Sequence, residues 1–394
     1  MLRYAANTFQ QVIKTTFHFL TGYHFQQIQD PIVASRTMKN IVILGGSYAG
    51  ITAAHGLLKQ VAKIGSFKIT LVSPNTHHYG NMASARGIVP EQFADETLFQ
   101  PIAPGFAKYP SSQFEFIVAS AESLDVVAKK VEISSATGHA TLEYDYLILA
   151  TGTRTAESTP FKGLGSTEAT KAALHDFQAQ VKRAKTIVVA GAGVTGVEVA
   201  GELGYSYGQS KEIILLSSTA KILPQSPKFV SRISTASLLN LHVSIKYLTR
   251  VVSSKASDGG HILTLSNGEH LKADMYIPTF GLTPNSTYIP SKFLNDNGFV
   301  EVDEYLRVKG LKDVWAIGDV SAMEAKQYLP SRAQAFYLSK TFASILRNKL
   351  PTPYKASTHR ERGWGGAFWE LENADIYDCY VEEESVYREF EAVG

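Results

Sequence analysis

Two glycine-rich turns and one Gly-Asp pair are the parts of this chain best suited to binding chemistry. The turns are GGSYAG at 45–50 and GAGVTG at 191–196, and the pair stands at 318–319. Glycines at this spacing let the backbone turn sharply from a strand into a helix, whose first amides then face a pyrophosphate. Two such turns in one chain predict two nucleotides that face each other across one enzyme.

The first turn predicts a nucleotide site that departs from the usual pattern in two places. Its small residues are Gly45, Gly46, Ser47 and Gly50. A serine replaces the middle glycine, and its small side chain still lets a phosphate approach. The next strand, FKITLVS, ends at Ser73, where an acid normally holds the ribose hydroxyls. Ser73 or Asn75 is therefore the candidate for a weaker ribose contact.

The second turn has glycine at all three positions, Gly191, Gly193 and Gly196. Its next strand, EIILLSS, ends at Ser217 and Ser218 without an acid. An acid there would bind the 2'-hydroxyl of NAD and repel the 2'-phosphate of NADP, so NADH and NADPH both stay open as ligands. Downstream, the loop TFGLTPNS contains Gly281, where backbone could approach the nicotinamide half.

Buried parallel strands must carry these turns. The runs IVIL at 41–44 and TIVVA at 186–190 are continuously apolar, as expected for strands covered on both faces. The strand YDYLILATGT ends at Thr151 and Gly152, and Asp319 ends another, at the sheet edge where doubly wound folds bind ligands. Such turns also serve as plain connections, and such an Asp as a helix cap. Together they predict an α/β protein with two Rossmann-like dinucleotide-binding domains.

Composition excludes several other classes of protein. The chain has 394 residues, 44% hydrophobic and 19% charged, which suits two or three globular domains. A net charge of +2 does not favour a nucleic-acid partner. The single cysteine, Cys379, rules out an intrachain disulfide, and the histidines show no ligand spacing, so no metal site is predicted.

The two ends differ from the middle. Residues 1–37 repeat apolar side chains at the spacing of one helical face and contain a single acid. This segment predicts peripheral membrane contact through residues 1–25 or mitochondrial targeting, with a helix packed on the body as the alternative. The last 39 residues hold ten acids against three arginines, which favours a solvated acidic terminus.

The ordered motifs GGSYAG, ATGT, GAGVTG, TFGLTPN and AIGD resemble those of the two-dinucleotide flavoprotein superfamily. Within it, the chain looks most like the apoptosis-inducing-factor-like, ferroptosis-suppressor type of NAD(P)H oxidoreductase from fungi. The resemblance implies a FAD domain that is split by an inserted NAD(P)H domain. The domains then expected are 1–37 (targeting), 38–155 (FAD), 156–285 (NAD(P)H), 286–355 (FAD) and 356–394 (a short divergent tail).

The resemblance also implies roles for particular residues. It places FAD contacts at Gly45, Ser47, Gly50, Ala121, Thr151, Gly152, Gly318 and Asp319, and nicotinamide dinucleotide contacts at Gly191, Gly193 and Gly196. Glu198 matches a glutamate that lies near the nicotinamide–flavin contact in relatives, and Arg86 is its candidate partner. The alternative is that Glu198 is an ordinary surface residue of a helix. Gln334 belongs to a helix whose first turn would stabilise reduced flavin and whose Ala-Gln pair meets the quinone in type II NADH dehydrogenases.

Two departures from the family limit its chemistry. The first motif lacks a neighbouring CxxxxC, which excludes disulfide reduction of the glutathione reductase kind. The sequence after Pro353 is unlike the C-terminal domain of the relatives.

The sequence thus predicts a FAD enzyme that takes hydride from NADH or NADPH and passes electrons to a quinone-like acceptor or oxygen. The alternatives are a flavin-dependent tailoring oxidase of a small metabolite and a redox-sensing or death-signalling protein with little turnover. Expected partners are a small-molecule acceptor, a membrane surface and a second copy of the chain. The expected location is the cytoplasm with membrane association, and the mitochondrion is the alternative.

Overall fold

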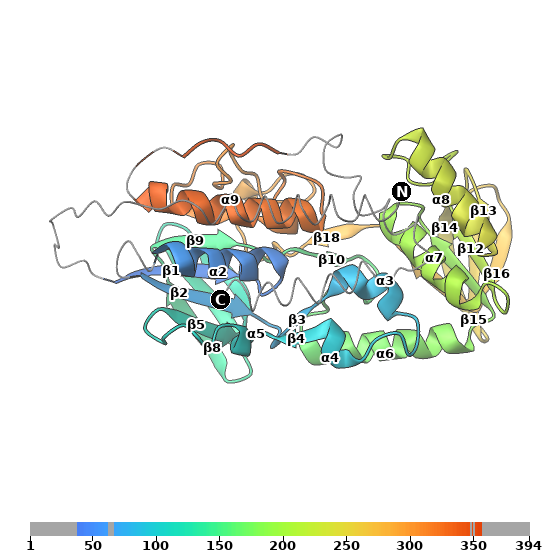
Figure 1. The fold of residues 1–394 in the computed structure, drawn as a ribbon, viewed down its shortest axis with the longest axis horizontal. Helices are drawn as coiled ribbons and strands as arrows, with labels where there is room; N and C mark the ends of the chain where they lie inside the picture. The colour runs from blue at the N-terminus through green and yellow to red at the C-terminus, as the bar shows by residue number, and fades with distance from the viewer. Residues whose placement is uncertain (1–37, 62–66, 347–348, 350, 357–394) are drawn as a thin grey trace, which may run out of the picture. The chain divides into compact units, whose positions relative to one another are not determined.

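The computed structural model describes residues 38–61, 67–346, 349 and 351–356 (Figure 1). The predictions for residues 1–37 and for 357–394 concern segments outside the described residues. Within the described part, no helix is long and apolar enough to cross a membrane. The same residues contain no group of three His, Cys, Asp or Glu side chains placed to hold a metal ion.

A five-stranded parallel sheet carries the first glycine-rich turn. Its strand order is β19 (Val314–Ala316), β9 (Tyr146–Leu149), β1 (Lys39–Leu44), β2 (Phe67–Ser73) and β5 (Phe114–Val118). Strand β19 pairs with β9 although more than 150 residues separate them in the chain. The first sheet therefore takes strands from both sides of the second sheet in the sequence.

Alternation along β1 explains how both faces of this sheet are covered. Ile41 and Ile43 pack with the helices α2 (Tyr48–Val61) and α9 (Tyr328–Leu346). Val42 and Leu44 pack instead with the antiparallel strands β6 (Ser120–Asp125), β7 (Lys130–Ser135) and β8 (Gly138–Glu143). Successive side chains of a strand point to opposite faces, so a continuous apolar run fits a sheet buried on both sides.

A second parallel sheet repeats this arrangement around the second turn. Its order is β13 (Val243–Lys246), β12 (Glu212–Leu216), β11 (Thr186–Ala190) and β17 (Met275–Pro278). One face packs with the helices α6 (Thr167–Arg183), α7 (Val194–Tyr207) and α8 (Lys228–Asn240). The other face meets the antiparallel strands β14 (Val251–Ser257), β15 (Gly260–Leu265) and β16 (His270–Ala273). The predicted α/β class with two Rossmann-like units is confirmed.

Short elements connect the two sheets. Strands β10 (Thr153–Thr155) and β18 (Leu282–Pro284) pair antiparallel where the chain enters and leaves the second unit. Strands β3 (His77–Tyr79) and β4 (Phe99–Pro101) form a second such pair. The remaining short helices are η1 (Asn81–Ala83), α3 (Ser84–Gly87), α4 (Asp95–Leu98), α5 (Ile102–Gly105), η2 (Ser291–Phe293) and η3 (Gly318–Val320).

Candidate functional site: two dinucleotide turns and one cavity

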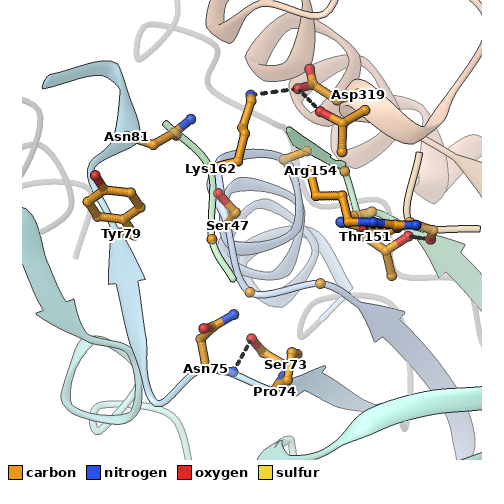
Figure 2. A pocket seen from close by; sticks show the side chains of 18 of the residues that line it. Ser47, Ser73, Pro74, Asn75, Tyr79, Asn81, Thr151, Arg154, Lys162 and Asp319 are labelled. Carbon is orange, nitrogen blue, oxygen red and sulfur yellow. Dashed lines mark hydrogen bonds and ion pairs between the residues drawn. The ribbon is translucent and has the colours of Figure 1, made fainter. Parts of the chain in front are cut away.

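A cavity of about 620 Å³ opens at the carboxyl ends of the first sheet (Figure 2). The turn after β1, the end of β2, the end of β9, the Gly-Asp turn and the start of α9 all contribute to its wall. The sequence-predicted residues that line it are Gly45, Gly46, Ser47, Ser73, Ala121, Thr151, Gly152 and Asp319. Segments from both ends of the described chain therefore meet in one cavity.

Backbone geometry explains why glycine occupies the first turn. Gly45 has a φ of +122°, a conformation that L side chains rarely adopt. A Cβ at Gly50 would collide with the carbonyl of Gly45, because α2 turns back closely against β1. The tight turn aims the first amides of α2 at the cavity, a cradle that suits a pyrophosphate.

The end of β2 offers hydroxyl and amide groups in place of an acid. Ser73 is buried, and its Oγ accepts a hydrogen bond from the backbone N–H of Asn75 at 3.1 Å (Figure 2). Both residues line the cavity, together with Pro74. The structure thus brings both ribose candidates to the site.

Two side chains donate to the Asp319 carboxylate. Lys162 Nζ lies 2.9 Å from its Oδ2, and the Thr153 hydroxyl donates to the same oxygen at 3.1 Å. The hydroxyl of Ser331, in the first turn of α9, lies 3.4 Å from Oδ1 and donates to the carbonyl of Gln327 at 2.8 Å. Lys162 and Asp319 are both largely buried, and Lys162 reaches its partner across the cavity wall in Figure 2. Sequence reasoning missed Lys162, for which the only signal was a lysine next to the glycines of KGLG.

The segment that carries Lys162 is fixed on its other side as well. The Tyr79 hydroxyl donates to the carbonyl of Pro160 at 2.7 Å, and Asn81 Nδ2 donates to the carbonyl of Phe161 at 3.1 Å. Phe161 itself is buried in the core beneath the second sheet. This segment therefore links the cavity wall to the second unit.

The end of β9 is locked to the loop that contains Gly281. The Thr151 hydroxyl donates to the carbonyl of Asn285 at 2.6 Å, and Asn285 Nδ2 donates back to the carbonyl of Thr151 at 2.8 Å. Arg154 adds a hydrogen bond to Asn285 Oδ1 at 2.9 Å. Gly281 has a φ of +78°, and its carbonyl accepts from Ala156. Asn285 and Arg154, which also line the cavity, were not predicted.

Gln334 is hydrogen-bonded to the backbone of the Gly-Asp turn. Its side chain is buried, with Oε1 accepting from the Gly318 N–H at 2.8 Å and Nε2 donating to Glu324 at 2.9 Å. It is not among the residues that line the cavity, whereas Tyr328 and Ser331 of the same helix are. A direct contact of Gln334 with a cofactor or quinone stays a prediction.

A buried histidine, also missed from the sequence, backs the first turn. Burial lowers the pKa of His78 to about 4, and the backbone carbonyl of Gly46 opposes this shift through a hydrogen bond. The ring of Tyr48 meets His78 edge-on at 4.5 Å and Tyr328 at 4.9 Å. His78 is therefore neutral near neutral pH, and its hydrogen bond with the backbone of Gly46 ties it to the first turn.

The second turn shows the same glycine geometry around β11. Gly191 has a φ of +109°, and a Cβ at Gly196 would collide with its carbonyl. Gly193 differs, because a Cβ there would meet no atom within 4 Å. Its open side is the space that a closely approaching pyrophosphate needs.

At the end of β12, the two serines take different positions. Ser217 is buried, and its hydroxyl lies 3.0 Å from the Thr219 carbonyl and 3.2 Å from that of Lys221. Ser218 is exposed. A contact of Ser217 with the cofactor stays a prediction, and its hydroxyl is hydrogen-bonded within the turn.

Arg86 lies against the helix that follows the second turn. Its Nε donates to both carboxylate oxygens of Glu202, at 3.0 and 3.2 Å, and both side chains are buried. Burial raises the pKa of Glu202, and the hydrogen bond and charge of Arg86 oppose that rise. Arg86 therefore pairs with a residue of α7, Glu202, which sequence reasoning did not single out. The role of Glu198, one turn earlier, stays a prediction.

Comparison with known proteins identifies the family. Residues 39–336 match the model of the pyridine nucleotide-disulphide oxidoreductases. The chain belongs to this family. It is 48% identical to oxidoreductase ptaL of Pestalotiopsis fici over 324 residues, which cover 81% of this chain and 87% of that protein. Ferroptosis suppressor protein 1 of Xenopus tropicalis is 26% identical over 324 residues, 79% of this chain and 80% of its own.

Solved structures share the fold of this family member. The water-forming NADH oxidase of Lactobacillus brevis, bound to NADH, superposes with a TM-score of 0.66 at 19% identity, over 80% of this chain and 71% of that one. Cys379 is the only cysteine of the whole sequence, so no dithiol can form within it. The chain is thus an oxidoreductase by family that lacks the cysteine pair of disulfide chemistry.

Proposed function

We propose that the chain is a FAD-dependent oxidoreductase that accepts hydride from NAD(P)H and passes electrons to a quinone-like acceptor or oxygen. The observation that carries this proposal is the pairing of two glycine turns, each at the carboxyl edge of its own parallel sheet, with β10 and β18 joining the two units. The family membership and the resemblance to ferroptosis suppressor protein 1 support the same conclusion.

The cavity has a chemical lining suited to FAD. The first turn offers amides to a pyrophosphate, Ser73 and Asn75 offer polar groups to a ribose, and Asp319 offers a carboxylate to the ribityl hydroxyls. When bound, FAD would supply the hydride acceptor. The chain's own residues orient the two ligands and need not transfer a proton during the reduction.

A spectroscopic titration tests this proposal. The purified protein should show visible flavin absorption, and anaerobic addition of a nicotinamide donor should bleach it. Reoxidation by a soluble quinone or by air then identifies the acceptor class. A colourless protein that FAD cannot reconstitute would disprove the assignment.

A tailoring oxidase remains the second candidate because of the aromatic residues at the cavity. The aromatic residues Tyr48 and Tyr328 line it together with Met82, which is 41% exposed. Such a wall suits a planar organic substrate. Bound flavin that ignores both nicotinamide donors, yet is reduced by a small phenolic or quinol substrate, would favour this candidate.

The cellular location is a separate proposal. We propose that the protein is cytoplasmic and contacts a membrane through residues 1–25. Mitochondrial targeting is the alternative. Vesicle sedimentation of the full chain and of a chain that starts at Met38 tests the membrane contact, because only the full chain should sediment.

A further inference from the structure

We propose that the second dinucleotide site prefers NADPH, with its 2'-phosphate bound at the turn Ser217–Lys221. This inference rests on the proposed function, since it names the nicotinamide donor of that site. It depends on the shape of this turn, on the charge around it and on the segment that lies beside it.

The turn presents hydroxyl groups where NAD-specific sites present an acid. Ser217 holds the turn from inside, with the Thr219 N–H donating to its Oγ at 3.3 Å. Thr219 Oγ1 lies 2.7 Å from the carbonyl of Lys221. Ser218 is left exposed at the edge of the sheet. The five residues of the turn, Ser217–Lys221, include no carboxylate that would repel a 2'-phosphate.

The charge of the surrounding sequence is uniformly positive. Between Ile213 and Ser257 the chain contains six lysines and arginines and no Asp or Glu. This stretch forms β12, the turn, α8, β13 and β14, and the segment 246–250 joins the last two strands. A dianionic phosphate therefore meets only positive side chains from this stretch.

Backbone hydrogen bonds place the next strand end beside the turn. The Ser217 N–H donates to the carbonyl of Lys246, and the Thr249 N–H donates to the carbonyl of Ser217, each at 2.8 Å. Leu248 donates likewise to the carbonyl of Thr219 at 3.2 Å. The segment 246–250 thus runs along the turn and brings Arg250 next to it.

Two cations of this region are suited to the phosphate. Lys221 donates to the carbonyl of Ser226 at 2.9 Å and has no carboxylate partner within the described part of the chain. Arg250 is exposed, and its guanidinium makes no ion pair with any residue that the structure describes. Lys246, in contrast, already pairs with Glu269 at 3.6 Å.

Binding of two nucleotide fragments to the holoprotein tests the subsite directly. 2',5'-ADP and 5'-AMP differ only in the 2'-phosphate, and we expect 2',5'-ADP to bind at least about tenfold tighter by calorimetry, with an advantage that shrinks as salt rises. NADPH should reduce the flavin with a correspondingly higher kcat/KM than NADH.

Variants then locate the phosphate. Ser218→Asp should abolish the advantage of 2',5'-ADP, and Lys221→Met or Arg250→Met should each reduce it several-fold. Lys255→Met is the matched control: it removes the same charge from the same stretch, on β14 and outside both the turn and the segment 246–250, and should leave the ratio within about twofold.

Other outcomes overturn the inference or the proposed function separately. Equal binding of the two fragments, or no binding of either to a protein whose flavin NADH reduces, would overturn the 2'-phosphate subsite alone. Flavin that neither dinucleotide reduces would overturn the proposed function, whichever fragment binds.

Discussion

Replacing Arg86 by Met should strongly destabilise the fold. The Arg86 and Glu202 side chains are only 7% and 9% exposed, and Nε lies 3.0 Å from the carboxylate. Unit charges about 4 Å apart attract by about 4 kcal/mol at an effective dielectric constant of about 20. Removing one partner leaves a buried, uncompensated carboxylate, which costs about 3–5 kcal/mol. We expect a loss of that size in the free energy of unfolding.

Urea unfolding of the variant measures this loss, with circular dichroism and tryptophan fluorescence as two probes of a single transition. The matched control is Lys68→Met, which breaks an ion pair of 2.7 Å with Glu115 whose side chains are 32% and 46% exposed. That exposed pair should contribute about 1 kcal/mol or less. Arg86→Met combined with Glu202→Met should recover most of the stability, because neither charge then remains buried.

The pH dependence provides an independent check on the Arg86 argument. Burial raises the pKa of Glu202, and the loss of Arg86 should raise it further. A carboxyl with a raised folded-state pKa is more favourable when protonated, so the deficit of Arg86→Met should shrink as pH falls from neutral to about 5. A variant no less stable than Lys68→Met, or a deficit that grows on acidification, would refute the reasoning.

Four further substitutions have specific expected outcomes. Gly193→Ala should raise the KM for the nicotinamide donor without lowering the melting temperature, whereas Gly196→Ala should lower it, because only the second Cβ meets backbone. Lys162→Met should weaken FAD binding about tenfold or more in equilibrium dialysis, since the Asp319 carboxylate then loses the cation that positions it and compensates its charge. Unchanged affinity would disprove this. Burial lowers the pKa of His55, a residue of α2, to about 4. The free energy of unfolding of the wild type should therefore fall as the pH drops from about 6.5 to about 4, by up to about 3 kcal/mol. His55→Gln should abolish that loss in acid titrations.

The fold could be predicted from the sequence because its signals are local. Apolar runs such as IVIL at 41–44 identify strands covered on both faces, and each glycine-rich turn marks the passage to a helix. The positive φ of Gly45 and Gly191 is what their position in the motif requires. The strand order was harder to predict from the sequence, because β9 and β19 pair although the whole second unit lies between them in the chain.

The sequence predicted those residues of the cavity lining that belong to the turns after the strands. Ser47, Thr151 and Asp319 all lie where the motifs placed them relative to the sheet edge. Lys162 was missed because it stands in a connecting segment with no periodic pattern. Its position results from hydrogen bonds of Tyr79 and Asn81 to neighbouring carbonyls, which no local pattern records.

Ion-pair partners show the limit of motif reasoning most clearly. Arg86 and Glu202 are separated by 116 residues, and Lys162 and Asp319 by 157. The family pattern suggested Glu198 for Arg86, which stays a prediction, and it did not indicate Glu202 one turn later on the same helix. The pairing of Arg86 with Glu202 depends on how α3 packs on α7, and no local sequence pattern records that packing. The sequence could therefore predict that a cation reaches this helix, and only the packed structure could show that Glu202 receives it.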